Sequence, residues 1–200
     1  MTPAIGHDPA AARPRVEGVR EQEVLDATLE VLADLGYDRL TMDSVATAAR
    51  ASKATLYRRW STKASLVIDA LLSQKGPMTI PDTGNLRDDL MQTFCGHGGL
   101  TDHRETAVFA SVITAISRDT EFAEAFRRDF IGPKAAIGHQ IFERARARGE
   151  IGPDVDIDLL APALAGIVLH RLFLMGEQPT PDLVTKVIDQ IILPAATGGR

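Results

Sequence analysis

Apolar residues recur through this chain at the three- and four-residue spacing of an α-helix, and this spacing constrains the fold more than any other feature. Between residues 24 and 35 they mark one face of a helix, and Phe122, Phe126 and Phe130 repeat every four residues. No stretch alternates apolar and polar residues as a half-buried β-strand does. The sequence therefore predicts an all-α protein of about nine helices.

Length and composition place the chain among globular proteins with one large domain or two small ones. Of its 200 residues, 44% are apolar and 24% are charged. A chain of this size can form a core without disulfides or metals. Cys95 is the single cysteine, so an intrachain disulfide is impossible and a reducing compartment is expected.

The sequence predicts no signal peptide and no membrane span. The N-terminus lacks the basic and apolar regions of a signal peptide. The longest apolar stretch, residues 159–169, is shorter than the roughly 20 residues that cross a bilayer, and His170 and Arg171 follow it. We therefore expect a cytoplasmic protein without a membrane partner.

Charge is distributed unevenly along the chain. The net charge of −5 argues against a nucleic-acid partner for the molecule as a whole. Residues 1–76, however, carry ten basic and ten acidic side chains, so residues 77–200 account for the full −5. Between Arg39 and Lys63 there are six basic residues and one acidic residue, a net charge of +5. A local basic patch of this kind can still attract nucleic acid.

Proline and glycine divide the chain into three expected segments. Residues 1–15 are rich in Pro, Ala and Gly and predict a flexible arm. Residues 16–75 predict a compact helical domain. Residues 76–84 contain two Pro and two Gly, so we place the boundary there. Residues 76–200 predict a larger helical domain.

Two short helices joined by a tight turn are expected within the first domain. Thr41 and Ser52 are good N-caps for helices over about 42–49 and 52–60. A longer helix precedes them and ends at Gly36, which is suited to a left-handed cap. This arrangement is a helix-turn-helix candidate.

The second short helix has an apolar side and a basic side. Leu56 and Trp60, four residues apart, anchor it against the first helix, where Ala46 and Ala49 are small enough for close packing. The opposite side is short and basic enough to enter a major groove. It carries Lys53, Tyr57, Arg58 and Arg59.

Residues 41–63, with the sequence TMDSVATAARASKATLYRRWSTK, resemble the DNA-binding domain of the TetR family of transcriptional regulators. The resemblance covers about residues 16–72 and rests on the A-x-x-A entry to the turn, S-K-x-T-L-Y, Trp60 and Lys63. Arg50 departs from the pattern, because family members usually carry glycine there. A non-glycine residue takes up that turn conformation at some cost in free energy.

The resemblance implies an N-terminal helix-turn-helix domain that binds double-stranded DNA. Lys53, Arg58 and Arg59 are candidates for the acceptors of guanine, whereas Tyr57 and Lys63 match positions that contact the DNA backbone. Arg13 and Arg15 are candidates for a minor groove. The full set of implied DNA-contacting residues is Thr41, Arg50, Ser52, Lys53, Ala54, Thr55, Tyr57, Arg58, Arg59 and Lys63.

Some of these residues also have a purely structural explanation. Thr41 and Ser52 would cap helices in any helical protein. Arg58 and Arg59 are also typical of a solvated helix face, and Arg50 either contacts a phosphate or faces solvent. The joint spacing of the set, rather than any single member, favours DNA binding.

The resemblance also implies that the larger domain dimerises and binds a ligand. The last two helices, over about 157–175 and 181–193, are the candidates for a two-fold interface, which suits a near-palindromic operator. The expected interface residues are Leu164, Ile167, Val168, Ile188 and Ile191. The alternative is that these residues are buried in the core.

A small apolar or aromatic effector is the expected ligand of the larger domain. Its candidate pocket residues are Phe94, His97, Phe109, Ile113, Phe126, Phe130, His139, Phe142, His170 and Phe173. For each of these residues the alternative is packing in the core, and the three histidines suit buried, hydrogen-bonded positions.

No pair of histidines has metal-ligand spacing, and no catalytic motif is present in the sequence. We therefore expect no metal, no cofactor and no enzymatic activity.

The sequence thus predicts a DNA-binding regulator, by family default a repressor that an effector releases from its operator. A constitutive regulator or activator without a ligand is the alternative. An enclosed cavity in the larger domain would favour the first, and a solid core the second.

Overall fold

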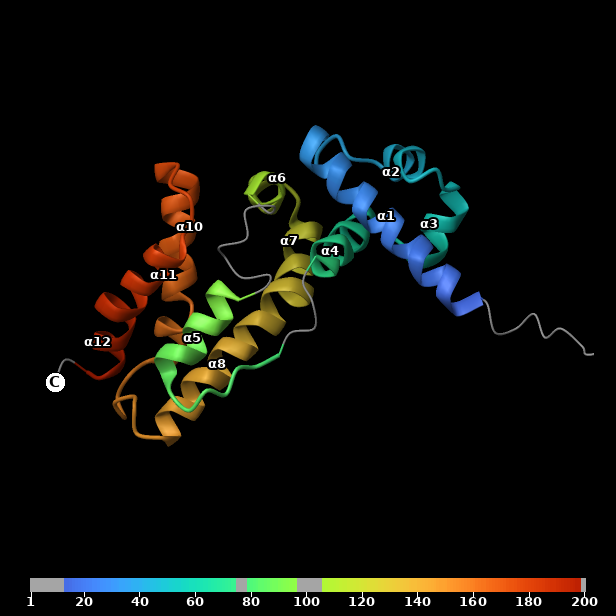
Figure 1. Cartoon of the computed structure of the whole chain (residues 1–200). Coiled ribbons are helices and arrows are strands. Elements are labelled where there is room, and N and C mark those ends of the chain that lie inside the picture. The colour runs from blue at the N-terminus through green and yellow to red at the C-terminus, as the bar shows by residue number, and fades with distance from the viewer. Residues whose placement is uncertain (1–12, 75–78, 97–105, 199–200) are drawn as a thin grey trace, which may run out of the picture. The chain divides into compact units, whose positions relative to one another are not determined.

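The computed structural model of the protein describes residues 13–74, 79–96 and 106–198, and its contacts separate the chain into two compact units, Met1–Ser73 and Gln74–Arg200 (Figure 1). The expected arm over residues 1–12, the side chains of Arg13 and Arg15, and His97 lie outside what is described. In the described ranges the chain is helical and contains no strand, as predicted.

The helices follow one another with short connections. Nine are present in the described ranges when α7–η2–α8, α9–α10 and α11–η3–α12 are each counted as one. In chain order the elements are α1 (Arg13–Leu35), α2 (Met42–Ala48), α3 (Lys53–Arg59), α4 (Lys63–Ser73), α5 (Leu86–Cys95), α6 (Thr106–Arg118), α7 (Thr120–Phe126), η2 (Arg127–Ile131), α8 (Gly132–Ala147), α9 (Ile157–Leu160), α10 (Ala163–Met175), α11 (Pro181–Val187), η3 (Ile188–Ile192) and α12 (Leu193–Ala196).

The first unit is built around α1. This helix begins at Arg13, so residues 13–15 are helical and do not belong to the expected arm. It ends before Gly36, whose φ of +73° gives the left-handed cap that the sequence predicted. Its buried side packs against α2 and α4. The core of the unit includes Leu32, Val45, Leu56, Leu66 and Val67.

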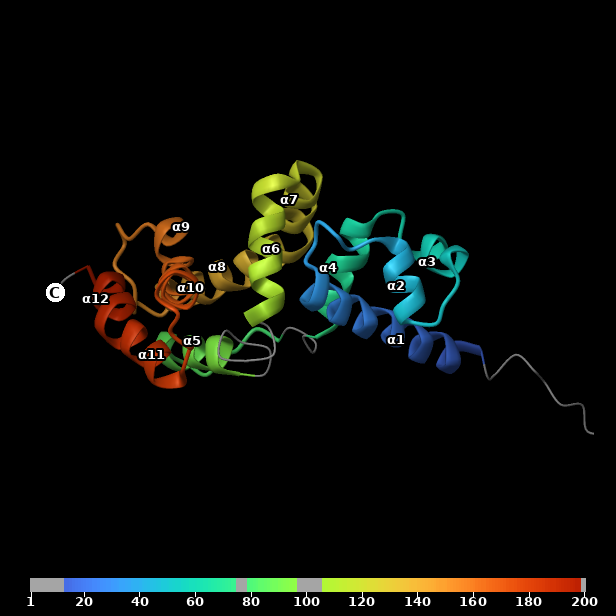
Figure 2. The ribbon, with the colours of Figure 1, turned by 90° about the horizontal axis from the view of Figure 1, so that it is seen from above.

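The second unit encloses a core between α5, α8, α10 and the last helix. α5 contacts α8 on one side and α11 and η3 on the other, and Figure 2 shows the same elements from above. Fully buried side chains from all four elements meet there, namely Leu90, Phe142, Leu164, Val184 and Ile188.

Two turns of π-helix occur in the described part of this unit, and each precedes a proline. The Gly132 N–H bonds to the carbonyl of Arg127, and the Leu193 N–H bonds to that of Ile188, five residues back in each case. Pro133 and Pro194 follow directly, and proline cannot donate a helical hydrogen bond. Gly132 and Pro133 therefore follow a π-turn within a continuous helix.

One helical stretch, Ile157–Met175, is long and apolar enough by length and composition to cross a membrane, with a mean hydropathy of 1.7. The sequence predicts this helix over about 157–175, but its uninterrupted apolar stretch, residues 159–169, is shorter than a membrane span. A break at residues 161–162 divides the stretch into α9 and α10. Leu164 and Val168 within it are buried in the core of the second unit. The core therefore accounts for part of its apolar character.

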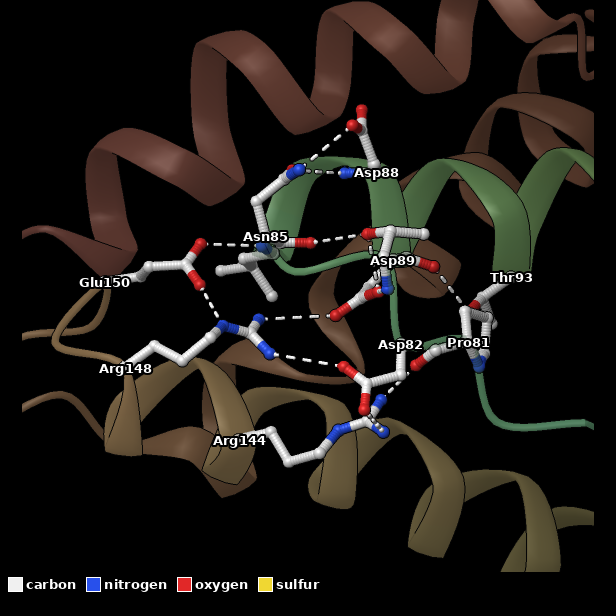
Figure 3. Close-up of polar contacts among 11 residues, drawn as sticks. Pro81, Asp82, Asn85, Asp88, Asp89, Thr93, Arg144, Arg148 and Glu150 are labelled. Carbon is white, nitrogen blue, oxygen red and sulfur yellow. Dashed lines mark hydrogen bonds and ion pairs between the residues drawn. The ribbon is translucent and has the colours of Figure 1, made fainter.

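A buried carboxylate ties the segment before α5 to the end of α8 (Figure 3). Asp89 is 0% exposed and accepts hydrogen bonds from the Thr83 N–H and hydroxyl, both at 2.7 Å, and from the Arg148 guanidinium at 3.3 Å. Glu150 accepts from Arg148 and from the Leu86 N–H. The hydrogen bond to Glu150, followed by that to Asp89, raises the pKa of Arg148 above its ordinary value. Asp89 lies in the first turn of α5, where an acidic residue interacts favourably with the helix dipole, but its side chain is buried.

We expect Asp89→Asn to lower the free energy of unfolding by about 2–3 kcal/mol, because it removes a buried charge from Arg148 and places a donor opposite donors. Urea unfolding followed by far-UV circular dichroism measures the change. Asp88→Asn is the matched control, since Asp88 is exposed on the same helix, where it accepts from Asn85 and lies 3.7 Å from Arg87. If Asp88→Asn lowers the free energy of unfolding as much as Asp89→Asn does, the assignment of Asp89 as a stabilising buried carboxylate is wrong.

Candidate nucleic-acid interface

The helix-turn-helix is formed by two capped short helices. The Thr41 hydroxyl accepts from the Ser44 N–H at 3.1 Å, and the Ser44 hydroxyl completes a capping box with the Thr41 backbone. The Ser52 hydroxyl accepts from the Thr55 N–H at 3.1 Å at the start of α3. Both N-caps are confirmed. Each hydroxyl therefore has a structural role, whether or not it also contacts DNA.

The turn between α2 and α3 contains a strained residue. Arg50 has a φ of +49° and is the one non-glycine residue with positive φ in the described part of the chain. Its N–H donates to the Thr47 carbonyl, and the Ala51 N–H donates to the Ala46 carbonyl at 2.9 Å, which closes the turn. Left-handed backbone raises the energy of a residue with a Cβ. The departure from glycine thus leaves the turn intact but strained.

Two side chains anchor α3. Leu56 is fully buried and Trp60, the C-cap, is nearly so. The Trp60 Nε1–H donates to Asp69 of α4 at 2.8 Å. Both residues are in the core, as the four-residue spacing predicted. Their burial turns the opposite side of α3 to solvent.

The exposed side of α3 is formed by Ser52, Lys53, Ala54, Tyr57 and Arg58. Tyr57 is 53% exposed, an unusual position for an aromatic ring in a soluble unit. Lys53 pairs with Asp43 of α2 at 2.5 Å. Among the described residues, Arg58 has neither an ion-pair nor a hydrogen-bond partner, so its guanidinium is available to a ligand.

Besides Lys53, two more of the predicted DNA contacts have partners within the unit. Arg59 is exposed, but it donates to Glu21 of α1 at 3.1 Å. The Lys63 ammonium donates to the Tyr37 carbonyl at 3.2 Å and lies 4.1 Å from the centre of the Tyr37 ring. Sequence reasoning did not identify Glu21 as the partner of Arg59 or Asp43 as the partner of Lys53. Each pair joins residues of different helices, and its spacing along the chain carries no local signal.

The predicted effector residues do not gather at one place. Phe109, Phe126 and Phe130 form an aromatic cluster, with ring centroids 6.2 Å apart for Phe109–Phe130 and 4.7 Å for Phe126–Phe130. Phe142 is buried in the core between α5, α8, α10 and the last helix, and Phe94 packs against that core. Phe173 is half-buried.

Three predicted effector residues are exposed, which corrects the expectation of buried histidines. His139 lies 3.5 Å from Asp158 on the surface, and His170 and Ile113 also face solvent. Their segments are apolar overall, but these positions fall on the outer sides of α8, α10 and α6. Among the described residues no group of three His, Cys, Asp or Glu side chains could hold a metal ion.

Most of the predicted dimer residues were assigned to the wrong side of their helices. Leu164, Val168 and Ile188 are buried in the core of the second unit and cannot contact a partner. Ile167 is half-buried and Ile191 is 46% exposed. These two line a surface groove of about 420 Å³ between α10 and α11, together with Arg171, Leu183 and Lys186 among others.

A separate apolar face of the second unit is exposed instead. Leu159 and Leu174 are 74% and 73% exposed, and Met175 is 61% exposed. We call these residues, together with Ile167 and Ile191, the α10 face; they belong to α9, α10 and η3. Exposed large apolar side chains are typical of interaction surfaces.

A helix-turn-helix unit with a basic, exposed second helix, joined to a separate helical unit, defines a DNA-binding transcriptional regulator. Two family models match the chain. "Bacterial regulatory proteins, tetR family" matches residues 24–70, and "Tetracyclin repressor-like, C-terminal domain" matches residues 80–191. The chain belongs to the TetR family of transcriptional regulators.

Known relatives agree with this assignment. An uncharacterised helix-turn-helix regulator of Mycobacterium tuberculosis is 37% identical over 89% of this chain and 88% of its own. The DNA-binding transcriptional repressor TetR of Mycobacteroides abscessus is 36% identical over 87% of this chain and 92% of its own. The crystal structure of Bacillus subtilis FadR in complex with stearoyl-CoA has the same fold, with a TM-score of 0.67 at 19% identity, and the match covers 89% of this chain and 98% of that one.

We expect Arg50→Gly to raise the free energy of unfolding by up to about 1 kcal/mol, because relief of left-handed strain exceeds the entropy that glycine adds to the unfolded chain. Thermal and urea unfolding measure the change. Ala51→Gly is the control, because Ala51 has no positive φ and gains only the entropy penalty. Equal destabilisation by both variants would show that the turn is not strained.

Proposed function

We propose that the protein is a cytoplasmic, homodimeric repressor that binds a near-palindromic operator through α3 and is released by a small apolar or aromatic effector bound in the second unit. The observation that carries the proposal is the exposed side of α3, where Lys53, Tyr57 and Arg58 extend from a helix-turn-helix of the TetR family. In such a unit the second helix enters the major groove.

The exposed residues of α3 divide into two kinds of contact in this proposal. Lys53 and Arg58 read base edges, because their donors match the acceptors of guanine, and Ala54 and Thr55 contact a thymine methyl group. Tyr57 contacts the backbone. Arg59 is held by Glu21, so we now place it with the residues that contact the backbone, which position the unit but do not read sequence. The others of this kind are Lys63, Thr41, Ser52 and Arg50.

The α10 face is the proposed two-fold interface. Leu159, Ile167, Leu174, Met175 and Ile191 are accessible apolar residues of α9, α10 and the last helix, and pairing would remove them from water. A two-fold pair places two recognition helices on half-sites about 34–36 Å apart. This surface replaces the one expected from Leu164, Val168 and Ile188.

In this proposal the effector binds the second unit near the aromatic cluster of Phe109, Phe126 and Phe130. Effector and operator oppose each other through a coupling free energy, so each lowers affinity for the other by the same factor. The fold neighbour FadR was crystallised with stearoyl-CoA, which supports the second unit as a ligand-binding unit.

A regulator without a ligand is the second candidate. The close stacking of Phe122, Phe126 and Phe130, with centroids 5.8 and 4.7 Å apart, favours it, because tightly stacked rings leave no room between them. Ligand titration against the operator complex separates the two candidates, since only a sensor loses DNA affinity.

Selection of bound duplexes from a random pool by the purified protein, read by sequencing, tests the central proposal. We expect an inverted repeat with half-sites one helical turn apart, because a two-fold dimer presents two identical α3 helices. Enrichment of no motif at physiological salt would refute a sequence-specific regulator.

Alanine variants of Tyr57 and Arg58 are expected to change DNA binding in different ways. Tyr57→Ala weakens binding to all duplexes to a similar degree, whereas Arg58→Ala also relaxes the preference at one base pair, by about 1–3 kcal/mol. Repeating the selection with each variant measures this. Arg39→Ala, which removes a cation of the same unit away from α3, is the charge control. Identical effects of the first two variants would contradict the proposed division.

Leu174→Asp should weaken the dimer at least ten-fold, because it places a charge in an apolar interface that must be desolvated. Sedimentation equilibrium over a range of concentrations measures the dissociation constant. Ile113→Asp introduces the same change at an exposed apolar residue of α6 outside the α10 face. A Leu174→Asp protein with the wild-type dissociation constant would exclude this face.

A further inference from the structure

Two consecutive residues of α1 contact the turn before the recognition helix and the last residue of that helix. Arg20 Nη2 donates to the carbonyl of Arg50, just before α3, at 2.6 Å. Glu21 accepts from Arg59, the last residue of α3, at 3.1 and 3.3 Å. In both views α3 lies beside the N-terminal half of α1 (Figures 1 and 2). One contact thus holds the turn before α3 and the other holds its last residue, on either side of Leu56, the one residue that α3 buries.

The short helix needs such contacts to keep its orientation. α3 has seven residues, and Leu56 is the one that it buries, with Trp60 following as C-cap. Leu56 and Trp60 fix the distance of the helix from the core. They only weakly resist rotation of the helix about the line that joins these two residues. Contacts at the two ends of the helix oppose this rotation directly.

Arg20 also acts on the strained turn. Its Nη2 binds the carbonyl of the residue that has the positive φ, and its Nη1 is held by Glu23 at 2.7 Å. A hydrogen bond from a charged donor is stronger than a neutral one. Arg20 therefore compensates for the absence of glycine at position 50.

We propose that Arg20 and Glu21 are positioning residues for sequence reading, which hold α3 at the angle where its base-reading side chains fit the groove. The proposal rests on the proposed function, because it assumes that α3 reads bases. Base contacts depend on donor geometry, whereas backbone contacts tolerate small displacements. Loss of either contact therefore lowers specific binding more than non-specific binding.

The experiment compares two duplexes, the sequence enriched by selection from a random pool and a scrambled version of it. Affinities are measured for Arg20→Met, Arg20→Lys and Glu21→Gln, each over a range of salt concentrations. Arg39→Met is the control for Arg20, since Arg39 also donates to a carbonyl, that of Leu35, away from α3. Glu30→Gln is the control for Glu21, since Glu30 is exposed on the same helix.

Glu21→Gln gives the sharper test, because a simple loss of negative charge and a loss of positioning predict opposite changes in affinity for the selected duplex. Removal of a negative charge by itself raises affinity for both duplexes, as Glu30→Gln does. Positioning predicts that Glu21→Gln lowers affinity for the selected duplex about five-fold while its affinity for the scrambled duplex matches that of Glu30→Gln.

Arg20→Met is expected to lower affinity for the selected duplex about ten-fold and to match Arg39→Met on the scrambled duplex. Arg20→Lys restores part of the loss, because a lysine retains a charged donor. In an Arg50→Gly background the effect of Arg20→Met falls below about three-fold, since the turn no longer needs compensation. Thermal unfolding of each variant shows whether the unit is folded, and the Glu21 variant tests the proposal independently of Arg20→Met.

An equal loss on both duplexes, with a salt slope reduced by about one, would make Arg20 a phosphate contact and overturn the proposal. So would a Glu21→Gln protein that binds both duplexes more tightly. If the wild-type protein does not distinguish the two duplexes, the proposed function itself fails, and that result is separate from any effect of the variants.

Discussion

Burial of Leu56 and Trp60 is the interaction on which the DNA-binding unit depends. A helix of seven residues is unstable in water by itself, so α3 depends on the burial of Leu56 and on its packing against α2. The hydrogen bond from Trp60 to Asp69 fixes the end of that helix. With this side held inward, the basic and aromatic side must face water, and the interface follows from the packing.

The turn before α3 shows a conflict between local preference and overall fold. Arg50 adopts a left-handed backbone that its own residue type disfavours, because the two flanking helices, each capped and anchored, leave the chain no other path. Arg20 lies at the carbonyl of this residue, 30 positions away in sequence. The strained residue thus accepts a hydrogen bond from a side chain of another helix.

The second unit separates its apolar residues into a core and an exposed face. Leu164 and Val168 of α10 pack inward, while Leu174 of the same helix is largely exposed. The core holds the helices together, and the exposed face is available for a partner. The Asp89–Arg148 pair adds a buried polar contact that fastens the start of the unit to α8.

Helix class, caps and the anchor residues could be predicted because they follow from short-range patterns. Thr41, Ser52 and Gly36 act within one turn of chain, and Leu56 and Trp60 show the helical period directly. The side of α10 that faces the core could not be predicted. A helix that is apolar on every side has no periodic signal to show which side is buried.

The sequence by itself determined the all-α class, the helix-turn-helix and its basic patch, since these depend on residue type and spacing along one segment. Only the tertiary structure decided which cations are paired, as with Arg59 and Glu21, and which carboxylate is buried, as with Asp89. These contacts join residues 38 and 59 positions apart. No pattern in one helix specifies its partner, because that choice depends on how the helices pack.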